Sequence, residues 1–411
     1  MIKRFLYRLF ERRHYWREVS FGEMAELYAS RLLRTLAVSM VSVFIGIYLY
    51  QNGYGITFIF VYFALYFVYR SCLAWPLAYT IAKSGPKHAM LISNLLYVPA
   101  LLLYAVISDY GITALVGAAV FQGLSVTLYD IAYMVDFSKV RSLDHTGKEL
   151  GYMHILEQVA KGLSPVIGGF IAYLFGPQAT LIFASTVFAL AAAPLFFTPE
   201  QVKTHQHITF RGLPYKRISG TVIAELAVGV DWIASGFMWS LLLAIGVFGI
   251  ADNAVYAQLG ILSSITIIVG VAVARLFGVI VDKNHGRELL RAGVVADSIT
   301  HILRPFIATP IGALLLNIMN ESVTTAYALP LTKAIFAQAD DLPGYRIVYM
   351  SIVSAMLAMG AAVFCGIIGL ISLYADELLT LRLGYVIAAL TVLTIMLNNL
   401  PALRRKRTFL R

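Results

Sequence analysis

Long apolar runs, separated by short turns and charged segments, follow one another along almost the whole chain. A bilayer core of about 30 Å needs roughly 20 apolar residues in a helix that rises ~1.5 Å per residue. Twelve runs reach that length, and each predicts one membrane-spanning helix. The runs are residues 28–50, 56–82, 88–107, 112–134, 150–174, 178–198, 219–248, 254–281, 288–307, 310–334, 346–373 and 379–402.

The composition agrees with this pattern. Hydrophobic residues make up 59% of the chain and charged residues only 13%, whereas a soluble domain is about half apolar and a quarter charged. The excess of apolar side chains needs lipid to face. We therefore interpret the chain as an all-α integral membrane protein with the lipid bilayer as its surroundings.

The loops between the runs alternate in charge. Short loops with almost no basic residues, at 51–55, 108–111, 175–178, 249–253 and 374–378, alternate with loops that contain several Lys and Arg residues. Both chain ends are basic as well. By the positive-inside rule, both termini and the 199–218 segment are predicted to be cytoplasmic. The very short outer loops favour a bacterial inner membrane.

The long polar stretch near the middle divides the chain into two halves. The predicted parts are an amphipathic N-terminal segment (1–27), a six-helix bundle (28–198), a cytoplasmic linker (199–218), a second six-helix bundle (219–402) and a basic tail (403–411). Ala25-Glu26-Leu27 recurs 199 residues later as Ala224-Glu225-Leu226. This register indicates an internal duplication, and such repeats place substrate sites at the membrane midplane between the halves.

The loop after the eighth run contains Gly278, Asp282, Lys283, Gly286 and Arg287. It resembles the loop signature of the major facilitator superfamily, with one extra residue before the second glycine. In that family the acid caps a neighbouring helix, which suits a carboxylate near a helix N-terminus, and the loop latches the cytoplasmic side. A tight turn with topogenic charges is the simpler alternative, but it does not explain the glycine and the acid.

A set of small residues and a proline in the fifth run resembles the antiporter signature of the same superfamily. These residues are Gly151, Ala160, Ser164, Pro165, Gly168 and Gly169. The family has glycine at each small position, whereas Ala160 and Ser164 are substitutes here. Small residues also let membrane helices approach closely for packing alone, which is the alternative interpretation.

The resemblance implies twelve helices in two pseudo-symmetric bundles and transport by alternating access. Phosphate-loop, zinc-protease and hydrolase motifs are absent from the sequence, so we expect no enzyme, cofactor or metal, and no nucleic-acid partner. A monomer that moves a small organic solute in exchange for protons, as an efflux antiporter, is the favoured hypothesis. Two alternatives remain: proton-coupled uptake of an organic anion or zwitterion, and a non-transporting scaffold or receptor.

Polar residues inside the first bundle are candidates for the substrate cavity. A charge at the bilayer centre costs ~2.5–3.5 kcal/mol even on lenient scales, so each one marks a functional candidate. Arg70 lies in the middle of the second run and Lys161 in the fifth, and Gln122 lies in the fourth. Glu157 precedes Lys161 by four residues, so a structural ion pair within one helix is the alternative for those two.

In the second bundle Asp297, His301 and Arg304 form one helical stripe in the ninth run. Span 10 returns antiparallel, which places Asp297 level with Glu321. A buried carboxyl beside a second carboxylate favours its protonated form, so Glu321, Asp297 and His301 are predicted to couple transport to protons.

Four further residues of the second bundle complete the predicted cavity, namely Asn317, Asn320, Asp231 and Trp232. Asn317 and Asn320 belong to span 10, on the same hairpin as the stripe of span 9. The alternative for this hairpin is a polar network that only holds spans 9 and 10 together.

The alternating loop charges generate a topology prediction. Reporter fusions at positions 53, 110, 176, 251 and 376 should report the outside, and fusions at 86, 145, 208 and 285 the cytoplasm. The physical reason is the retention of Lys- and Arg-rich loops on the cytoplasmic side. A pair of neighbouring fusions with reversed activity would contradict the span assignment.

Overall fold

The structure is a computed structural model that describes residues 21–140, 146–196, 207–282, 285–342 and 344–397. Within these ranges the side chains of residues 21–25, 138–140, 146–156, 267–269, 274, 282 and 397 are not described. The secondary structure of the described chain is helical, as the apolar pattern predicts.

The first half contains α2 (Phe21–Ser42), α3 (Ile45–Gln51), α4 (Ile56–Ser84), α5 (Pro86–Ala105), α6 (Ile107–Val140), α7 (Thr146–Phe175) and α8 (Pro177–Ala192). The second half contains α9 (Tyr215–Trp232), η2 (Ile233–Met238), α10 (Trp239–Leu243), η3 (Ala244–Phe248), α11 (Ala254–Asp282), α12 (Gly286–Leu303), α13 (Pro310–Asp340), α14 (Arg346–Ile371) and α15 (Glu377–Val392). α2 and α3 together make the first span. The seventh runs from α9 to η3, where η2 and η3 are π-helical.

Ten of the spans are long and apolar enough to cross a membrane by length and composition, within the described residues. The other two of the twelve predicted spans are α12 and α13. Their apolar runs are interrupted by Asp297 and His301 in α12 and by Asn317, Asn320 and Glu321 in α13. The predicted class, twelve helices in two six-helix bundles, is confirmed, and the two most polar spans contain the candidate site.

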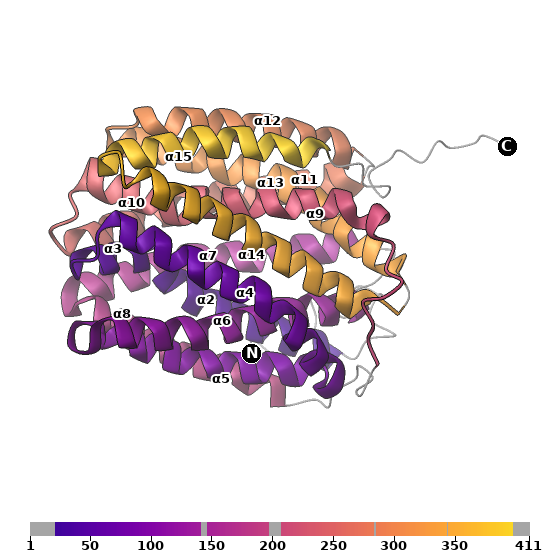
Figure 1. The fold of residues 1–411 in the computed structure, drawn as a ribbon. Helices are drawn as coiled ribbons and strands as arrows, with labels where there is room; N and C mark the ends of the chain where they lie inside the picture. The colour runs from indigo at the N-terminus through magenta and orange to yellow at the C-terminus, as the bar shows by residue number, and fades with distance from the viewer. Residues whose placement is uncertain (1–20, 141–145, 197–206, 283–284, 343, 398–411) are drawn as a thin grey trace, which may run out of the picture.

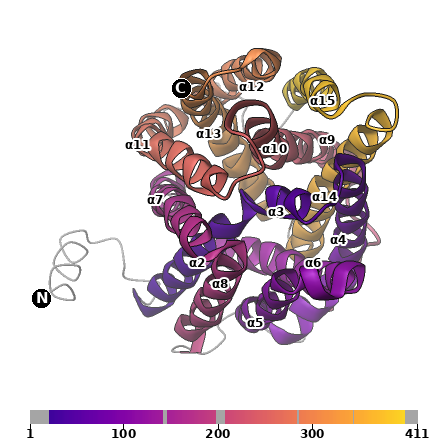
Figure 2. The same cartoon turned by 90° about the vertical axis from the view of Figure 1, so that its left-hand side faces the viewer.

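The two halves form separate bundles that lie side by side. In Figure 1 the indigo-to-magenta half occupies the lower part and the orange-to-yellow half the upper part. The view along the helices shows two places where the bundles meet, α7 against α11 and α4 against α14 (Figure 2). These pairs are the two seams between the halves.

The helix bounds repeat with the offset of 199 residues found in the sequence. Shifting α4, residues 56–84, by 199 gives 255–283, and α11 covers 254–282. The same shift takes α5 (86–105) to 285–304, against 286–303 for α12, and α8 (177–192) to 376–391, against 377–392 for α15. The duplication therefore extends to the length and spacing of these helices.

One contact marks the axis that relates the halves. The side-chain amide of Gln51 donates to the carbonyl of Ile250 over 2.8 Å, and these residues are 199 positions apart. Equivalent positions of two related bundles touch only where they lie next to the symmetry axis. The pseudo-two-fold axis therefore passes between the C-terminal ends of the first and seventh spans.

The α7–α11 seam depends on glycines that allow backbone contact. A Cβ on Gly169 would lie 2.4 Å from the carbonyl oxygen of Tyr256, and one on Gly260 2.3 Å from that of Pro165. Gly168 lies against α2, where a Cβ would be 2.8 Å from the Met40 oxygen. These residues of the predicted span 5 motif pack helices together.

The remaining motif residues of α7 are partly placed. Ala160 is fully buried, and the hydroxyl of Ser164 donates to its carbonyl over 2.5 Å. Such a bond within one helix satisfies the hydroxyl in an apolar setting. Gly151 belongs to α7, but its surroundings lie outside the description.

Both ends of the molecule hold the halves together. At the end that carries the 51–55 and 249–253 loops, Tyr50 donates to Glu377 over 2.8 Å, and Tyr256 donates to the Gln51 oxygen over 2.6 Å. At the opposite end the rings of Phe137 and Phe336 lie 5.4 Å apart across the halves. The two halves therefore touch each other at both ends.

The predicted cytoplasmic latch is described only in part. Gly278 lies in α11, and Gly286 and Arg287 begin α12. The Asp282 side chain and Lys283 lie outside the described residues. The latch therefore stays a prediction.

The close contact between α7 and α11 predicts that one added methyl group lowers the stability of the protein. Gly260→Ala should lower the thermal unfolding midpoint in detergent, because the added carbon overlaps the Pro165 carbonyl and overpacking costs ~1–3 kcal/mol. Gly366→Ala in α14 is the matched control, since its Cβ meets nothing within 4 Å. Equal midpoints for the two variants would contradict the close seam.

Candidate functional site between the two halves

Two polar clusters lie near the middle of the spans, one in each half. Both are built by the helices at the same three places of the repeat: α2, α5 and α6 in the first half, and α9, α12 and α13 in the second. The cationic cluster consists of Arg34, Ser93, Asn94, Tyr97, Ser125 and Tyr129. The acidic cluster consists of Asp231, Ser235, Asp297, His301, Arg304, Asn320 and Tyr327.

Arg34 is the centre of the cationic cluster. It is buried and donates to Asn94 over 2.8 Å and to Ser93 over 3.1 Å. Its guanidinium lies 3.9 Å from the centre of the Tyr129 ring, a cation–π distance. Neutral oxygens and aromatic faces thus stabilise this charge.

Two ion pairs accompany this cluster. Arg31 pairs with Glu157 over 2.7 Å, and Arg70 pairs with Asp130 over 2.9 Å. Glu157 therefore bonds to α2 and not to Lys161 of its own helix, which is exposed. Sequence reasoning missed Arg31 and Arg34 because both lie near the start of the predicted run 28–50, whereas Arg70 lies in the middle of its run.

Asp231 accepts three hydrogen bonds in the acidic cluster. Ser235 donates to Oδ1 over 2.6 Å, the His301 Nε2 atom lies 3.0 Å from Oδ1, and the Tyr327 hydroxyl donates to Oδ2. The carboxylate is 2% exposed. Three donors around a buried carboxyl favour its charged form, so Asp231 is a fixed negative charge.

Asp297 has the opposite surroundings. It is 0% exposed, and neither carboxyl oxygen makes a hydrogen bond. Its Oδ2 atom lies 3.7 Å from the His301 Nε2 atom. Because a buried charge without hydrogen bonds is very costly, the surroundings of Asp297 stabilise a carboxylate far less than those of Asp231 do.

The protonation of His301 follows from its neighbours. Arg304 is always a donor, and its Nη1 atom lies 3.1 Å from His301 Nδ1. Nδ1 therefore accepts, and the neutral ring carries its hydrogen on Nε2, where it donates to Asp231. A second proton on Nδ1 would face Arg304, so the two cannot occupy that position together.

A metal ion fits this group poorly. Asp231, Asp297 and His301 each bring one ligand atom within 4.8 Å of the others. However, the His301 Nε2 lone pair is taken by its hydrogen, and the Arg304 guanidinium adds a positive charge beside the ring. The chemistry of the cluster suits a proton better than a metal cation.

Glu321 lies apart from the group with which the sequence places it. Its carboxylate accepts from Gln158 of α7 and contacts Gly270 of α11, in the seam between the halves. The described contacts of Asp297 involve Asp231 and His301 instead. The difference arises because Asn320 faces Arg304 while Glu321 is turned 100° further around α13.

The other predicted cavity residues occupy different places. Trp239 donates to Asn317 over 2.6 Å, and Gln122 bonds to Tyr97 over 2.9 Å. Trp232 is exposed, with its ring 6.0 Å from Phe67 of the other half. Asn317 and Gln122 thus border the two clusters, whereas Trp232 lies between the halves.

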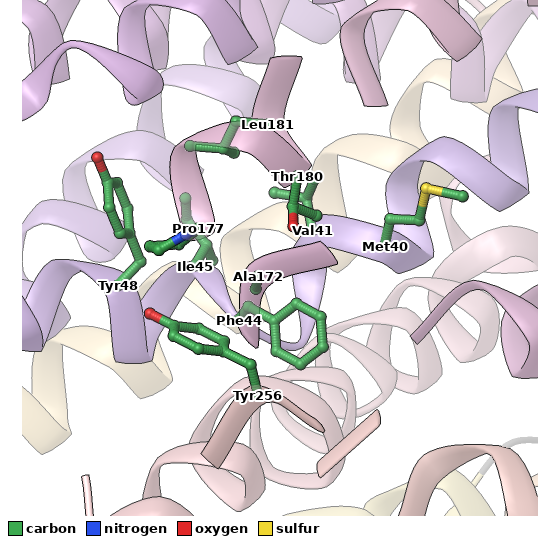
Figure 3. A pocket seen from close by; sticks show the side chains of 10 residues that line it. All are labelled: Met40, Val41, Phe44, Ile45, Tyr48, Ala172, Pro177, Thr180, Leu181 and Tyr256. Carbon is green, nitrogen blue, oxygen red and sulfur yellow. The ribbon is translucent and has the colours of Figure 1, made fainter. Parts of the chain in front are cut away.

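A small cavity near the end that carries the 51–55 loop is distinct from these clusters. Figure 3 shows its mostly apolar lining between α2, α3, α7, α8 and α11. Its polar groups are already satisfied: Thr180 donates to the Gly168 carbonyl, and the Tyr48 hydroxyl to the Tyr104 carbonyl. With no charge in its wall, it has little that could recognise a polar solute.

Comparison with known families assigns the architecture. The model of the Major Facilitator Superfamily matches residues 27–329. The chain belongs to this superfamily. It is therefore an integral membrane transporter and not an enzyme.

Solved structures of other superfamily members share the fold of this transporter. The human organic anion transporter MFSD10 (TETRAN) is 11% identical, covers 93% of this chain and 99% of its own, and gives a TM-score of 0.66. The E. coli fucose:proton symporter FucP is 14% identical. The match covers 91% of this chain and 96% of FucP, with a TM-score of 0.63. No curated protein sequence matches.

The three hydrogen-bond donors around Asp231 predict that the negative charge of its carboxylate stabilises the folded transporter. Asp231→Asn should lower the thermal unfolding midpoint, because a lost charge-assisted hydrogen bond costs about 1–3 kcal/mol. Asp109→Asn, at an exposed position at the start of α6, is the control. If both variants unfold at the wild-type temperature in detergent, Asp231 does not hold the cluster together.

Proposed function

We propose that this protein is a monomeric, proton-coupled transporter of a small organic solute in a bacterial inner membrane. The proton site is the group of Asp297, Asp231 and His301. Asp297 carries the transported proton, Asp231 supplies a fixed negative charge, and His301 links the two carboxyls.

The observation that supports this proposal is the contrast between the two buried aspartates. Asp231 accepts hydrogen bonds from three donors. Asp297 lies only a few ångströms away and makes no hydrogen bond. Two carboxyls this close in a low-dielectric interior hold one proton between them. Opening of the bundle to either side would hydrate Asp297 and release that proton, which is what coupling to a gradient requires.

Glu321, which the sequence analysis groups with Asp297 and His301, receives a different role. Its bond to Gln158 joins α13 to α7 across the seam. We propose that Glu321 is a structural contact between the halves and does not carry the proton. A glutamine at this position can accept the same hydrogen bond.

The two polar clusters favour symport over antiport. The span 5 motif favours antiport, but Gly168 and Gly169 are explained by helix packing, which both directions need. Cationic residues in one half and a proton site in the other suit an anion that moves together with a proton. We therefore propose symport, with efflux by antiport as the second candidate.

The proposed proton site predicts that one substitution stops proton movement while the exchange of solute across the membrane continues. Purified protein is reconstituted in vesicles containing a pH-sensitive dye, and gluconate, succinate, glucose or tetraphenylphosphonium is added. A transported anion should acidify the lumen in wild type. Asp297→Asn should abolish this change while keeping counterflow of labelled solute, because an amide cannot release a proton.

Glu321→Gln is the matched control and should keep the pH change. Loss of the pH change in this variant alone would move the proton site to Glu321. Alkalinisation with tetraphenylphosphonium would establish antiport. Absence of counterflow for every solute would favour the non-transporting alternative.

A further inference from the structure

Arg304 is a buried cation held by neutral groups. It is 1% exposed, and its described hydrogen bonds go to Ser235 over 3.1 Å, to Asn320 over 2.5 Å and to the neutral His301 ring. No carboxylate oxygen of a described residue lies within ion-pair distance of its nitrogens, and the Nε atom has no hydrogen-bond partner. A buried guanidinium is normally paired with an anion.

The surroundings of Arg304 are aromatic on one side and polar on the other. The aromatic rings of Trp239 and Tyr385 lie 5.1 and 5.4 Å from the guanidinium carbon. Its polar partners Ser235 and Asn320 are partly exposed. The polar side is therefore the less buried side of the guanidinium, next to the π-helical segment η2.

We infer that Arg304 binds a carboxylate group of the transported solute, reached past Ser235 and Asn320. A guanidinium presents paired N–H groups that match the two oxygens of a carboxylate. To bind both oxygens, Arg304 turns its Nη1 atom away from His301 Nδ1. The solute carboxylate then forms the direct ion pair that no carboxylate of the described residues forms with Arg304, since Asp231 reaches it only through Ser235 and His301.

This inference rests on the proposed proton site and determines how solute and proton are coupled. The charged and titratable groups around His301 are Asp231 from α9, Asp297 from α12, Arg304 directly after α12, Tyr327 from α13 and Tyr385 from α15. Without solute, the Arg304 charge repels a proton from this group. A bound carboxylate neutralises Arg304 and frees Nδ1, so the proton binds more tightly.

Solute and proton therefore strengthen each other's binding, as the reciprocity of linked equilibria requires. The proton comes from the solution on the open side and lands on the Asp297 carboxyl or on His301 Nδ1. No other bond forms or breaks. A carrier that favours both ligands together moves them in the same direction.

The binding step is tested with pairs of carboxylates and uncharged analogues. The full chain in detergent is exposed to succinate or succinamide, gluconate or glucitol, and benzoate or benzamide, and Trp fluorescence and thermal unfolding are recorded. At least one carboxylate should raise the midpoint by several degrees while its uncharged analogue does not. Stabilisation by uncharged analogues only, or by no compound, overturns the inference.

Variants then assign the effect to Arg304. Arg304→Gln should weaken carboxylate binding at least tenfold, and Arg304→Lys should weaken it less because the charge remains. Arg217→Gln, which removes an exposed cation paired with Asp341, should bind as wild type. Unchanged binding in Arg304→Gln contradicts the inference. If that variant does not fold, the decision passes to Arg304→Lys and to the wild-type measurement below.

Proton linkage separates this inference from the proposed function. Addition of the bound carboxylate to wild type in weakly buffered solution should cause proton uptake, and its affinity should fall as pH rises. Carboxylate binding with no proton uptake would overturn the linkage and the proton site but retain Arg304 as the anion site. Proton-driven transport of an uncharged solute would overturn the Arg304 site and retain the proton site.

Discussion

Charge inside a low-dielectric interior is the constraint on which this structure depends. Each buried ion has to be paired, surrounded by hydrogen bonds or neutralised by a proton. Asp231 is surrounded by hydrogen-bond donors, whereas Asp297 has none, and for Asp297 we propose a proton. Arg34 in the other half is stabilised by neutral oxygens and an aromatic face. The position of the functional groups follows from the way each charge is satisfied.

The seams determine which parts can move. Where glycines allow backbone contact between α7 and α11, the two helices lie so close that an added methyl group would overlap the facing carbonyl. At the two ends the halves are joined by individual hydrogen bonds and ring contacts, such as Tyr50 with Glu377 and Phe137 with Phe336. Such contacts can break at one end while the seams persist, which suits a rocking motion between two bundles.

The fold could be predicted from the sequence because apolar length and loop charge are local signals. The site was predicted only in part. Asp297, His301 and Arg304 share one stripe, and helical spacing is enough to find them. Counting residues across the hairpin gives the level of Glu321 along the helix. It does not give the side to which the carboxylate points, because that depends on the rotation of α13 about its own axis. Arg34 was missed because its stabilising partners lie on α5 and α6, far away in the sequence.

The contact between Gln51 and Ile250 shows how closely the two halves keep their common geometry. Two identical bundles around that axis would contain every ionisable group twice, so an acid in one would face the same acid in the other. Joining both copies in a single polypeptide removes this restriction, because each copy then mutates independently. The fused chain can thus hold a cluster around a buried arginine in one half and a cluster with two buried aspartates in the other, a polarity that a symmetric pair could not acquire.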